Sequence, residues 1–404
     1  MFKKNNKILI ITPRFPIPTN GACEQDRLEG ILKFKNLGYE IEVLTKIFQW
    51  QKRAEIEQFS QDNDIAIHSL PYHSEIKKSF LQKILFYTRR LINPMYWDGA
   101  AYEYSHDDIK LALKKILTDF QPDLVWFDYT YLWPLYNIVK KYNLPIVTRS
   151  INFEPRHFLD EDGDTLWNRI KSLPKYVSEY ITIKASDLIF SITPKEEKIY
   201  KKLGARKVVN LPLRRLPALL VNERVIKDNN ILHLFFMGAS YNVPHSRHAA
   251  DFIIREIAPI INIKLPGKFI FHIVGKKLPE DLSKRCKENI IEEGFIENLE
   301  EFLNNMDIAL IPSLFGSGMQ QKIFEPLARG IPTITSPRGL SDYPFKHREH
   351  LLLASTKDQY VEQIISLNDV QLRRLLSKNA LTLCHDIFSQ QVFNQKIIHE
   401  LYLI

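Results

Sequence analysis

Residues 307–337, DIALIPSLFGSGMQQKIFEPLARGIPTITSP, decide the fold. The stretch begins and ends with short apolar runs, DIALIPS (307–313) and IPTITSP (331–337), which are typical of buried strands. Between them, a loop with two glycines leads into MQQKIFEPLARG (319–330), which has helical spacing and ends on a glycine. A strand, a helix and a second strand in this order predict a βαβ unit with parallel strands.

The same alternation of apolar runs and helical patterns continues along the chain in both directions. Strands that are apolar on nearly every residue are buried on both faces, and strands interleaved with helices form parallel sheets. The sequence therefore predicts an α/β protein with two Rossmann-like βαβ domains. The other runs form two series, at 7–12, 39–45, 123–128, 144–150, 187–193 and 207–212, and at 232–238, 269–275 and 290–296.

A break in this alternation predicts the domain boundaries. Residues 213–230 have mixed charge, a proline and no sustained period, which is typical of a linker. The first domain is expected over 1–212 and the second over 231–384. Residues 385–404 have helical spacing, and the sequence leaves open whether this helix closes the second domain or crosses back to the first.

Composition excludes several classes of protein. The chain has 404 residues, of which 45% are hydrophobic, and it contains no run of eighteen apolar residues that would predict a membrane-spanning helix. Its first apolar run is too short for a signal peptide, which predicts a cytoplasmic location. The 3 cysteines are far apart, so neither a disulfide framework nor a zinc site is expected. The net charge of +8 favours anionic partners.

The loop and helix after the strand at 307–313 suggest a site for an anion. Gly316 and Gly318, on either side of Ser317, allow the backbone to approach a ligand closely. The amide groups at the start of a helix favour a negatively charged ligand. Lys322 and Glu325 are three residues apart and share a helix face. A cation suits a diphosphate, and a carboxylate suits the two hydroxyls of a ribose. The alternative is a glycine turn followed by a solvated ion pair.

Four segments of the second half, at 235–261, 269–282, 290–313 and 316–340, resemble the GT-B glycosyltransferases in their order and spacing. The likeness is closest to the large retaining group often called family 4, which builds bacterial polysaccharides of the cell envelope. It covers nearly all of 231–384, whereas the first half resembles the family more loosely, through residues 11–45. The resemblance implies two domains across a cleft, with a nucleotide-sugar donor held mainly by the second domain and an acceptor by the first.

The resemblance also assigns donor-binding residues. Glu325 matches the glutamate that holds the donor ribose, and Lys322 matches a lysine found in the subgroup with a GSGMQ-x-K loop. The remaining positions lie where the family meets the diphosphate and sugar through backbone amides, or where a strand ends beside the donor. They are Gly318 and Met319 in the loop, and Gly238, Ser240 and Tyr241 after the strand at 232–238.

Because of two departures from the family pattern, the resemblance does not decide which sugar is transferred or how active the enzyme is. Many relatives carry a second glutamate eight residues before the ribose-binding one, and here that position is Ser317. The segment RSINFEPRHF resembles an acceptor-side motif, but Ile151 stands where relatives have a histidine. Arg149, Asn152 and Glu154 of the same motif are present and are expected on the acceptor side of the cleft.

Two further stretches of the first half have two interpretations each. Gly21, after the first strand, and Arg27, in the following helix, either contact the acceptor or diphosphate or belong to an ordinary βα turn. Residues 77–97, KKSFLQKILFYTRRLINPMYW, interleave basic and apolar residues. They form either a basic amphipathic helix that lies on an anionic membrane, on the inner face of the plasma membrane, or a surface helix packed on the core.

The resemblance predicts a retaining glycosyltransferase that moves a sugar from a nucleotide diphosphate to a glycan or lipid-linked hydroxyl. Lys322 would stabilise charge on the leaving diphosphate, and no side chain is named as nucleophile or base. No metal, no other cofactor and no nucleic-acid partner is expected. The alternatives are a sugar-nucleotide epimerase of similar fold and a sugar-nucleotide binder without activity. Donor base, sugar, acceptor, linkage and oligomeric state stay open.

Overall fold

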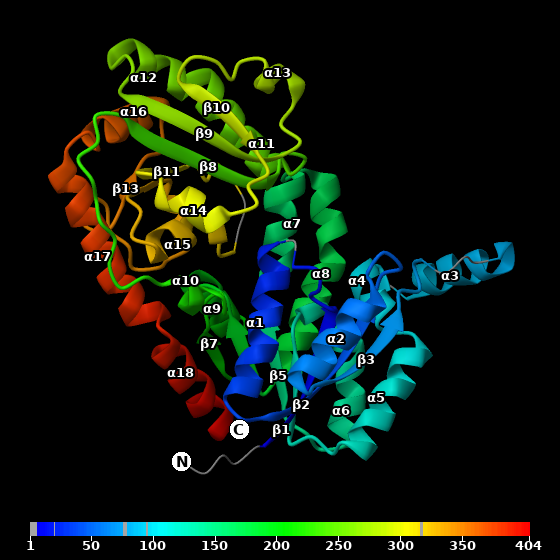
Figure 1. Cartoon of the computed structure of the whole chain (residues 1–404). Coiled ribbons are helices and arrows are strands. Elements are labelled where there is room, and N and C mark those ends of the chain that lie inside the picture. Colours follow the sequence, from blue (N-terminus) through cyan, green and yellow to red (C-terminus); the bar gives the residue numbers. More distant parts are fainter. Residues whose placement is uncertain (1–5, 20, 76–78, 94–95, 316–317) are drawn as a thin grey trace. The chain divides into compact units, whose positions relative to one another are not determined.

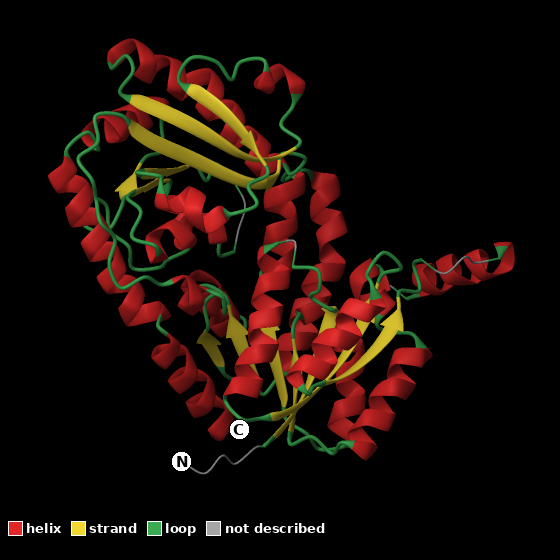
Figure 2. Ribbon diagram, in the orientation of Figure 1, coloured by secondary structure: helices red, strands yellow, loops and turns green. Residues whose placement is uncertain are grey.

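The computed structural model describes residues 6–19, 21–75, 79–93, 96–315 and 318–404. The chain divides into two compact units, with Met1–Arg215 and Phe393–Ile404 in unit 1 and Leu216–Val392 in unit 2. Each unit has one sheet with helices on both faces (Figures 1 and 2). All the strand pairings within the two sheets are parallel. The prediction of two parallel α/β domains is therefore confirmed.

The sheet of unit 1 has seven strands in the order β3-β2-β1-β4-β5-β6-β7. Its centre is β4 (Leu124–Phe127), in which every residue is buried, because helices cover both faces. The other strands are β1 (Lys7–Arg14), β2 (Glu40–Ile47), β3 (Ala66–Pro71), β5 (Ile146–Ser150), β6 (Leu188–Ser191) and β7 (Val208–Asn210). The helices are α1 (Ala22–Asn36), α2 (Arg53–Asn63), α3 (Phe80–Ile92), α4 (Gly99–Glu103), α5 (Asp107–Asp119), the 3₁₀ helix η2 (Thr130–Leu135), α6 (Tyr136–Lys141), α7 (Glu154–Asp162), α8 (Leu166–Ala185) and α9 (Pro194–Lys202).

The sheet of unit 2 has six strands in the order β10-β9-β8-β11-β12-β13. They are β8 (Leu232–Ser240), β9 (Phe269–Lys276), β10 (Ile290–Gly294), β11 (Ile308–Ile311), β12 (Thr333–Thr335) and β13 (Leu352–Leu353). The helices are α10 (Leu216–Leu219), α11 (Pro244–Phe252), the π-helical η3 (Ile253–Ile257), α12 (Ala258–Lys264), α13 (Glu280–Ser283), α14 (Leu299–Asn304), α15 (Gln321–Ala328), the 3₁₀ helix η4 (Pro337–Leu340), α16 (Lys357–Ser366) and α17 (Val370–Phe388).

The strand order of each sheet reverses at one place. Successive strands run outward from β1 through β2 to β3, and the chain then returns to the other side of β1 with β4. The same return joins β11 to the free side of β8, where Ile308 pairs with Leu234. At such a switch point the loops after the two central strands diverge, and parallel α/β sheets bind ligands there. In unit 2 these loops follow β8 and β11.

The last helix, α18 (Gln390–Tyr402), belongs to unit 1 from Phe393 onward. Phe393 is buried, Lys396 Nζ donates to the Asn210 carbonyl at 3.0 Å, and Lys207 Nζ pairs with Glu400 at 2.6 Å. The predicted linker, 213–230, is divided between the two units: residues 213–215 belong to unit 1 and residues 216–230 to unit 2. The functional roles given to the two domains stay predictions.

Candidate functional site

The loop that carries the predicted donor site leads from β11 into α15 at the switch point of unit 2. Gly316 and Ser317 lie outside the described residues. Gly318 has φ of +77°, a left-handed conformation that favours glycine, and its carbonyl accepts a hydrogen bond from Ser341 Oγ at 2.7 Å. No described side chain caps the start of α15. Its first amide groups, next to the buried Met319, therefore present the positive end of the helix dipole.

Lys322 lies in the first turn of α15 and is half-buried. Its Nζ is 5.3 Å from the centre of the Phe236 ring, which belongs to β8 on the other side of the switch point. Burial lowers the pKa of Lys322 to about 8. Within the described part of the chain no acidic group pairs with this ammonium. A cation held partly out of water without a counterion favours an anionic ligand.

Glu325 is one turn further along α15 and is only 4% exposed. Its Oε1 is 3.4 Å from Arg329 Nε, and its Oε2 accepts a hydrogen bond from Gln321 Nε2 at 3.2 Å. The alternative of a solvated ion pair between Lys322 and Glu325 is therefore wrong. Both side chains are withdrawn from bulk water, and the carboxylate is held in place by its own helix.

The end of β8 brings Gly238, Ser240 and Tyr241 to the same edge of the sheet. Tyr241 is buried, and its hydroxyl donates to the Val274 carbonyl at 2.8 Å, so the ring joins β8 to β9. A Cβ on Gly238 would lie 3.2 Å from Ser246 Cβ and 3.3 Å from Tyr241 Cε1, which makes Gly238 a packing residue. Ser240 is half-buried, and its Oγ accepts a hydrogen bond from the Asn242 amide at 3.3 Å. Donor contacts by these residues stay predictions, and the burial of Tyr241 argues against a contact by its side chain.

In unit 1, Gly21 and Arg27 lie at the corresponding switch point, after β1. Gly21 is the residue before the first turn of α1. The Arg27 guanidinium is buried, lies 5.9 Å from the centre of the Tyr129 ring and is 3.4 Å from Glu24 Oε1. Because Tyr129 follows β4, the structure brings the ends of β1 and β4 together around Arg27. The acceptor or diphosphate contact of Gly21 and Arg27 stays a prediction.

Arg149 has a different position from the one expected. Its side chain is fully buried, and its Nη2 donates to the Pro212 carbonyl at 2.9 Å and lies 3.3 Å from Asp26 Oδ1. Its Nη1 donates to the Leu211 carbonyl. These contacts fix the segment after β7 against α1. The structure therefore gives Arg149 a structural role, because contact with an acceptor would require these buried hydrogen bonds to break.

The partner of Arg149 belongs to a buried ion cluster, formed by Asp26, Asp128, Arg149 and Arg214, that sequence reasoning missed. Arg214 Nη2 lies 2.8 Å from Asp26 Oδ2 and 3.1 Å from Asp128 Oδ1. Burial raises the pKa of Asp26, but Arg214 and Arg149 outweigh it and hold the pKa below its usual range. Asp26 and Arg214 are 188 residues apart in sequence, so no local pattern reveals the pair.

The rest of the acceptor-side motif lies around the start of α7. Asn152 is half-buried and Ile151 is buried. Burial raises the pKa of Glu154, whose Oε2 is 3.7 Å from Lys175 Nζ. Burial also raises the pKa of Glu179 to about 8, and its Oε1 accepts a hydrogen bond from the Glu154 amide at 3.1 Å. Glu179 was not predicted, because a lone glutamate in a helix carries no signal of burial.

The described residues were compared with the requirements of a metal site and of a membrane-spanning helix. In this part of the chain no three His, Cys, Asp or Glu side chains are grouped to hold a metal ion. No described helix combines the length and the apolar character needed to cross a bilayer. The expectation that no cofactor is needed stays a prediction.

Comparison with known proteins finds a family model that matches part of the chain, and a fold. Residues 232–369 match the family model described as Glycosyl transferases group 1. No curated protein sequence is significantly similar to the chain. The matched residues include both β8 and α15, so they contain the whole switch point of unit 2.

Several solved structures resemble the whole chain. HepE from Anabaena, in complex with UDP, has a TM-score of 0.66 at 14% identity, over 98% of this chain and 100% of HepE. Sucrose-phosphate synthase from Thermosynechococcus elongatus has a TM-score of 0.67 at 14% identity, over 98% of each chain. A glycosyltransferase from Rickettsia africae has a TM-score of 0.64 at 14% identity, over 98% of this chain and 99% of its own. At these identities the likeness shows the fold, which is the two-domain GT-B fold.

Proposed function

We propose that this chain, whose residues 232–369 match the group 1 glycosyl transferases and whose fold is GT-B, is a glycosyltransferase. It moves a sugar from a nucleotide-diphosphate donor to a hydroxyl of a glycan or lipid-linked acceptor, with retention at the anomeric carbon. The observation that carries the proposal is the ammonium of Lys322, half-buried at a sheet switch point beside an uncapped helix start.

The diphosphate of the donor is the proposed partner of Lys322. A diphosphate supplies the negative charge that the described surroundings of the ammonium lack, and it also suits the amide groups at the start of α15. HepE was crystallised with UDP and, in another structure, with UDP-glucose, which supports UDP-sugars as the first donors to test.

Glu325 is proposed to bind the ribose of the donor. A carboxylate offers about four lone-pair sites, and the described contacts of Glu325 with Gln321 and Arg329 leave capacity for two hydroxyl donors. The same contacts hold the carboxylate in one orientation before the donor arrives, which lowers the cost of ordering on binding.

The reaction breaks the bond between the sugar and the diphosphate through an oxocarbenium-like transition state. Negative charge then develops on the leaving diphosphate, where Lys322 and the amide groups of α15 stabilise it. The leaving phosphate is proposed to take the proton of the incoming hydroxyl, which attacks from the same face. This proposal rests on the resemblance to family 4 and assigns no side chain as nucleophile or base.

The donor site is tested by a thermal-shift screen of UDP-, GDP-, dTDP- and CMP-sugars, followed by calorimetry on the Glu325→Ala variant. We expect a loss of about 1–3 kcal/mol in donor binding, because the ribose hydroxyls lose their acceptor. Glu362→Ala, which removes an exposed carboxylate from α16, is the matched control and should bind like the parent protein. Equal donor affinity in both variants would refute the site.

The same purified protein also distinguishes a transferase from the two alternatives, an epimerase and a binder without activity. Without an acceptor, a transferase leaves the nucleotide sugar intact or slowly hydrolyses it, whereas an epimerase forms a new isomer. A binder without activity retains the Glu325-dependent affinity but transfers sugar to no acceptor. Formation of an isomer would overturn the proposal in favour of epimerisation.

A further inference from the structure

Helix α3 lies apart from the packed body of unit 1. Figure 1 shows α3 projecting away from the sheet of unit 1. Every described side chain on the helix is exposed except that of Arg90. Phe80, Leu81, Leu91 and Ile92 are 77%, 71%, 72% and 81% exposed. A helix of 13 residues is marginal in water by itself, so a face of this kind is typical of a helix that packs on a partner.

Among the side chains of α3 that the structure describes, the apolar ones gather on one side of the helix. Their spacing of i, i+1, i+4, i+5, i+7, i+11 and i+12 covers one face at 100° per residue. The members of this apolar face are Phe80, Leu81, Ile84, Leu85, Tyr87, Leu91 and Ile92. Lys83, Arg89 and Arg90 lie on the opposite side.

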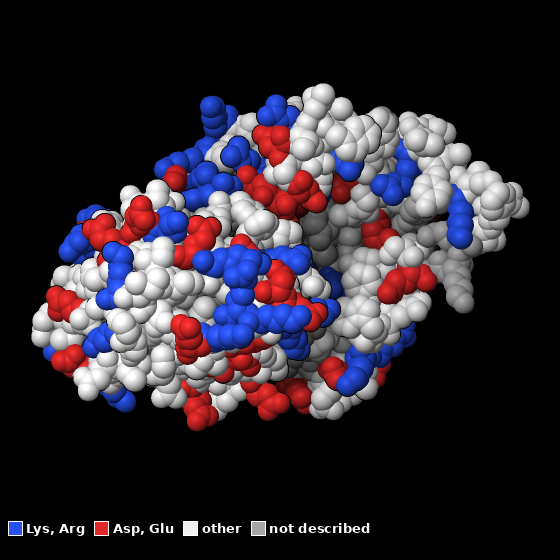
Figure 3. Space-filling model, turned by 90° about the horizontal axis from the view of Figure 1, so that it is seen from above, with Lys and Arg blue, Asp and Glu red and all other residues white. Residues whose placement is uncertain are grey.

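The sequence that contains α3 carries charge of a single sign. Between Glu75 and Asp98 the sequence contains five basic residues and no acidic residue. At the far right of Figure 3, on the side to which α3 projects in Figure 1, the side chains seen are blue and white. A helix that packs on another soluble protein commonly carries both signs, whereas a basic polar face beside an apolar face suits an anionic lipid surface.

The start of α3 is capped, and its end is attached to the chain that follows. At its start, Ser79 Oγ accepts from the Gln82 amide at 3.4 Å while Gln82 Oε1 accepts from the Ser79 amide at 2.9 Å. Near its end, Arg90 donates to the carbonyls of Tyr96 and Trp97 at 3.2 Å and 2.9 Å. The bonds of Arg90 attach the C-terminal end of α3 to the segment that follows it, and the described apolar side chains are exposed.

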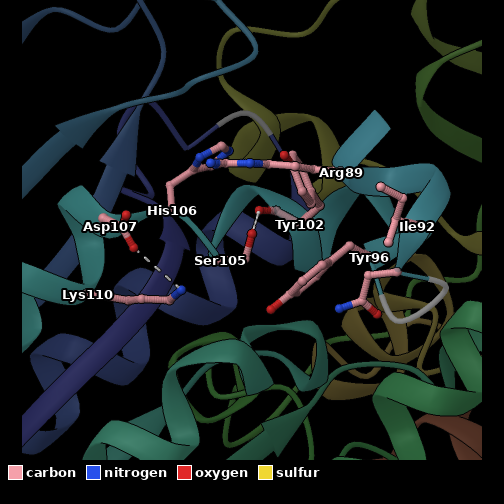
Figure 4. A pocket seen from close by; sticks show the side chains of 9 residues that line it. Arg89, Ile92, Tyr96, Tyr102, Ser105, His106, Asp107 and Lys110 are labelled. Carbon is pink, nitrogen blue, oxygen red and sulfur yellow. Dashed lines mark hydrogen bonds and ion pairs between the residues drawn. The ribbon is translucent and has the colours of Figure 1, made fainter. Parts of the chain in front are cut away.

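A pocket of about 360 Å³ opens beside the end of α3. Figure 4 shows Arg89 and Ile92 of α3 around the same pocket as Lys110 of α5. Lys110 Nζ is 3.9 Å from Asp107 Oδ1, a long and weak pairing for a lysine. The hydroxyl-bearing side chains of Tyr96 and Tyr102 also line the pocket. Arg89 and Lys110 supply two cations to this pocket and Asp107 one carboxylate, so its lining has a net positive charge next to an apolar helix, which suits the phosphate of a lipid headgroup.

We propose that α3 lies in the surface of an anionic phospholipid bilayer, with its apolar face at the level of the acyl chains. Arg89 and Lys110 then bind the phosphate of one lipid headgroup in the pocket. The inference adds a site on the inner face of the plasma membrane to the proposed function. It is tested without donor or acceptor, so its failure is distinguishable from failure of the glycosyltransferase proposal.

The experiment is flotation of the full chain with vesicles of phosphatidylcholine, with and without phosphatidylglycerol. We expect binding only to the vesicles with phosphatidylglycerol, and weaker binding at high salt. The triple variant Leu81→Gln, Ile84→Gln, Leu91→Gln should lose at least about tenfold in binding, since it removes the centre of the apolar face while glutamine keeps the helix. Lys83→Gln with Arg89→Gln should reduce the preference for the anionic lipid; Arg90 is kept because it anchors the helix.

The matched control is Val225→Gln, Ile263→Gln, Leu375→Gln, which changes three exposed apolar residues of unit 2. This control should float like the parent protein. All variants are compared for circular dichroism and sedimentation. Flotation of the α3 triple variant equal to that of the parent, or a dimer of the parent that the triple variant loses while neither binds vesicles, would overturn the proposal.

Discussion

Lys322 is the residue on which the proposed chemistry depends. It lies beside Phe236 instead of an acid, and burial lowers its pKa to about 8. Near neutral pH the side chain is therefore mostly an ammonium, but one that is easily deprotonated. A bound diphosphate stabilises the charged form and so raises this pKa again. Donor binding and protonation of Lys322 are consequently linked.

This linkage predicts a pH dependence of donor affinity. Above pH 8 the ligand-free lysine must gain a proton before it binds the donor, so the dissociation constant should rise by up to about tenfold per pH unit. The Lys322→Met variant should bind more weakly at pH 7 and lose this slope. The measurement is calorimetry from about pH 6.5 to 9.5, a range chosen around this pKa. Lys346→Met, at an exposed lysine, serves as control, and a slope that survives in Lys322→Met contradicts the assignment.

At the scale of elements, α1 is shaped by the buried ion cluster of Asp26, Asp128, Arg149 and Arg214. The helix supplies Asp26 to the cluster, and one turn later Gly30 makes room for the Arg214 guanidinium. A Cβ on Gly30 would lie 2.0 Å from Arg214 Nη1. The glycine inside this helix is therefore required by packing, although alanine has the higher helix propensity.

Gly30→Ala is expected to destabilise unit 1 by about 1–3 kcal/mol, because the guanidinium must move away from Asp26 and Asp128. All 5 tryptophans of the chain lie in unit 1, so urea unfolding followed by tryptophan fluorescence reports this unit. Gly99→Ala is the matched control, since its Cβ would meet no described atom closer than 3.6 Å. A midpoint for Gly30→Ala equal to that of the control would show that Arg214 relaxes without cost.

Most of the strands, but not all, could be predicted from the sequence. Each apolar run named from the sequence overlaps a strand, but β3 and β13 at sheet edges were missed. Every residue of β3, an edge strand with a neighbour on one side only, is exposed or half-buried. β13 has two residues, too few to form a pattern. β3 was therefore missed because it is weakly buried, and β13 because it is short.

At the scale of the molecule, the chain ends by returning to the unit in which it began. Phe393 of α18 is buried, and Lys33 Nζ of α1 lies 5.4 Å from the centre of its ring. Together with the contacts of Lys396 and Glu400, this ring makes the last residues part of the core of unit 1. Unit 1 thus combines α1 and α18, two helices far apart in the sequence.

Phe393→Ala should therefore lower the free energy of unfolding of unit 1 by about 3–5 kcal/mol, the usual loss for a buried phenylalanine. The tryptophan signal of unit 1 again provides the measurement. Tyr402→Ala in the same helix, where the side chain is 57% exposed, should leave the urea midpoint nearly unchanged. Identical midpoints for the two variants would mean that α18 does not contribute to the core.

The sequence alone determined the two parallel sheets, the glycine-containing loop before α15 and the shared helix of Lys322 and Glu325. These features depend on periodicity and on neighbours within a few residues, which a sequence displays directly. Only the tertiary structure decided that Arg149 is structural, that Lys322 lies beside an aromatic ring and that the apolar face of α3 is exposed. Burial and the pairing of charges depend on segments far apart in the chain, such as Asp26 and Arg214, and these meet only after folding.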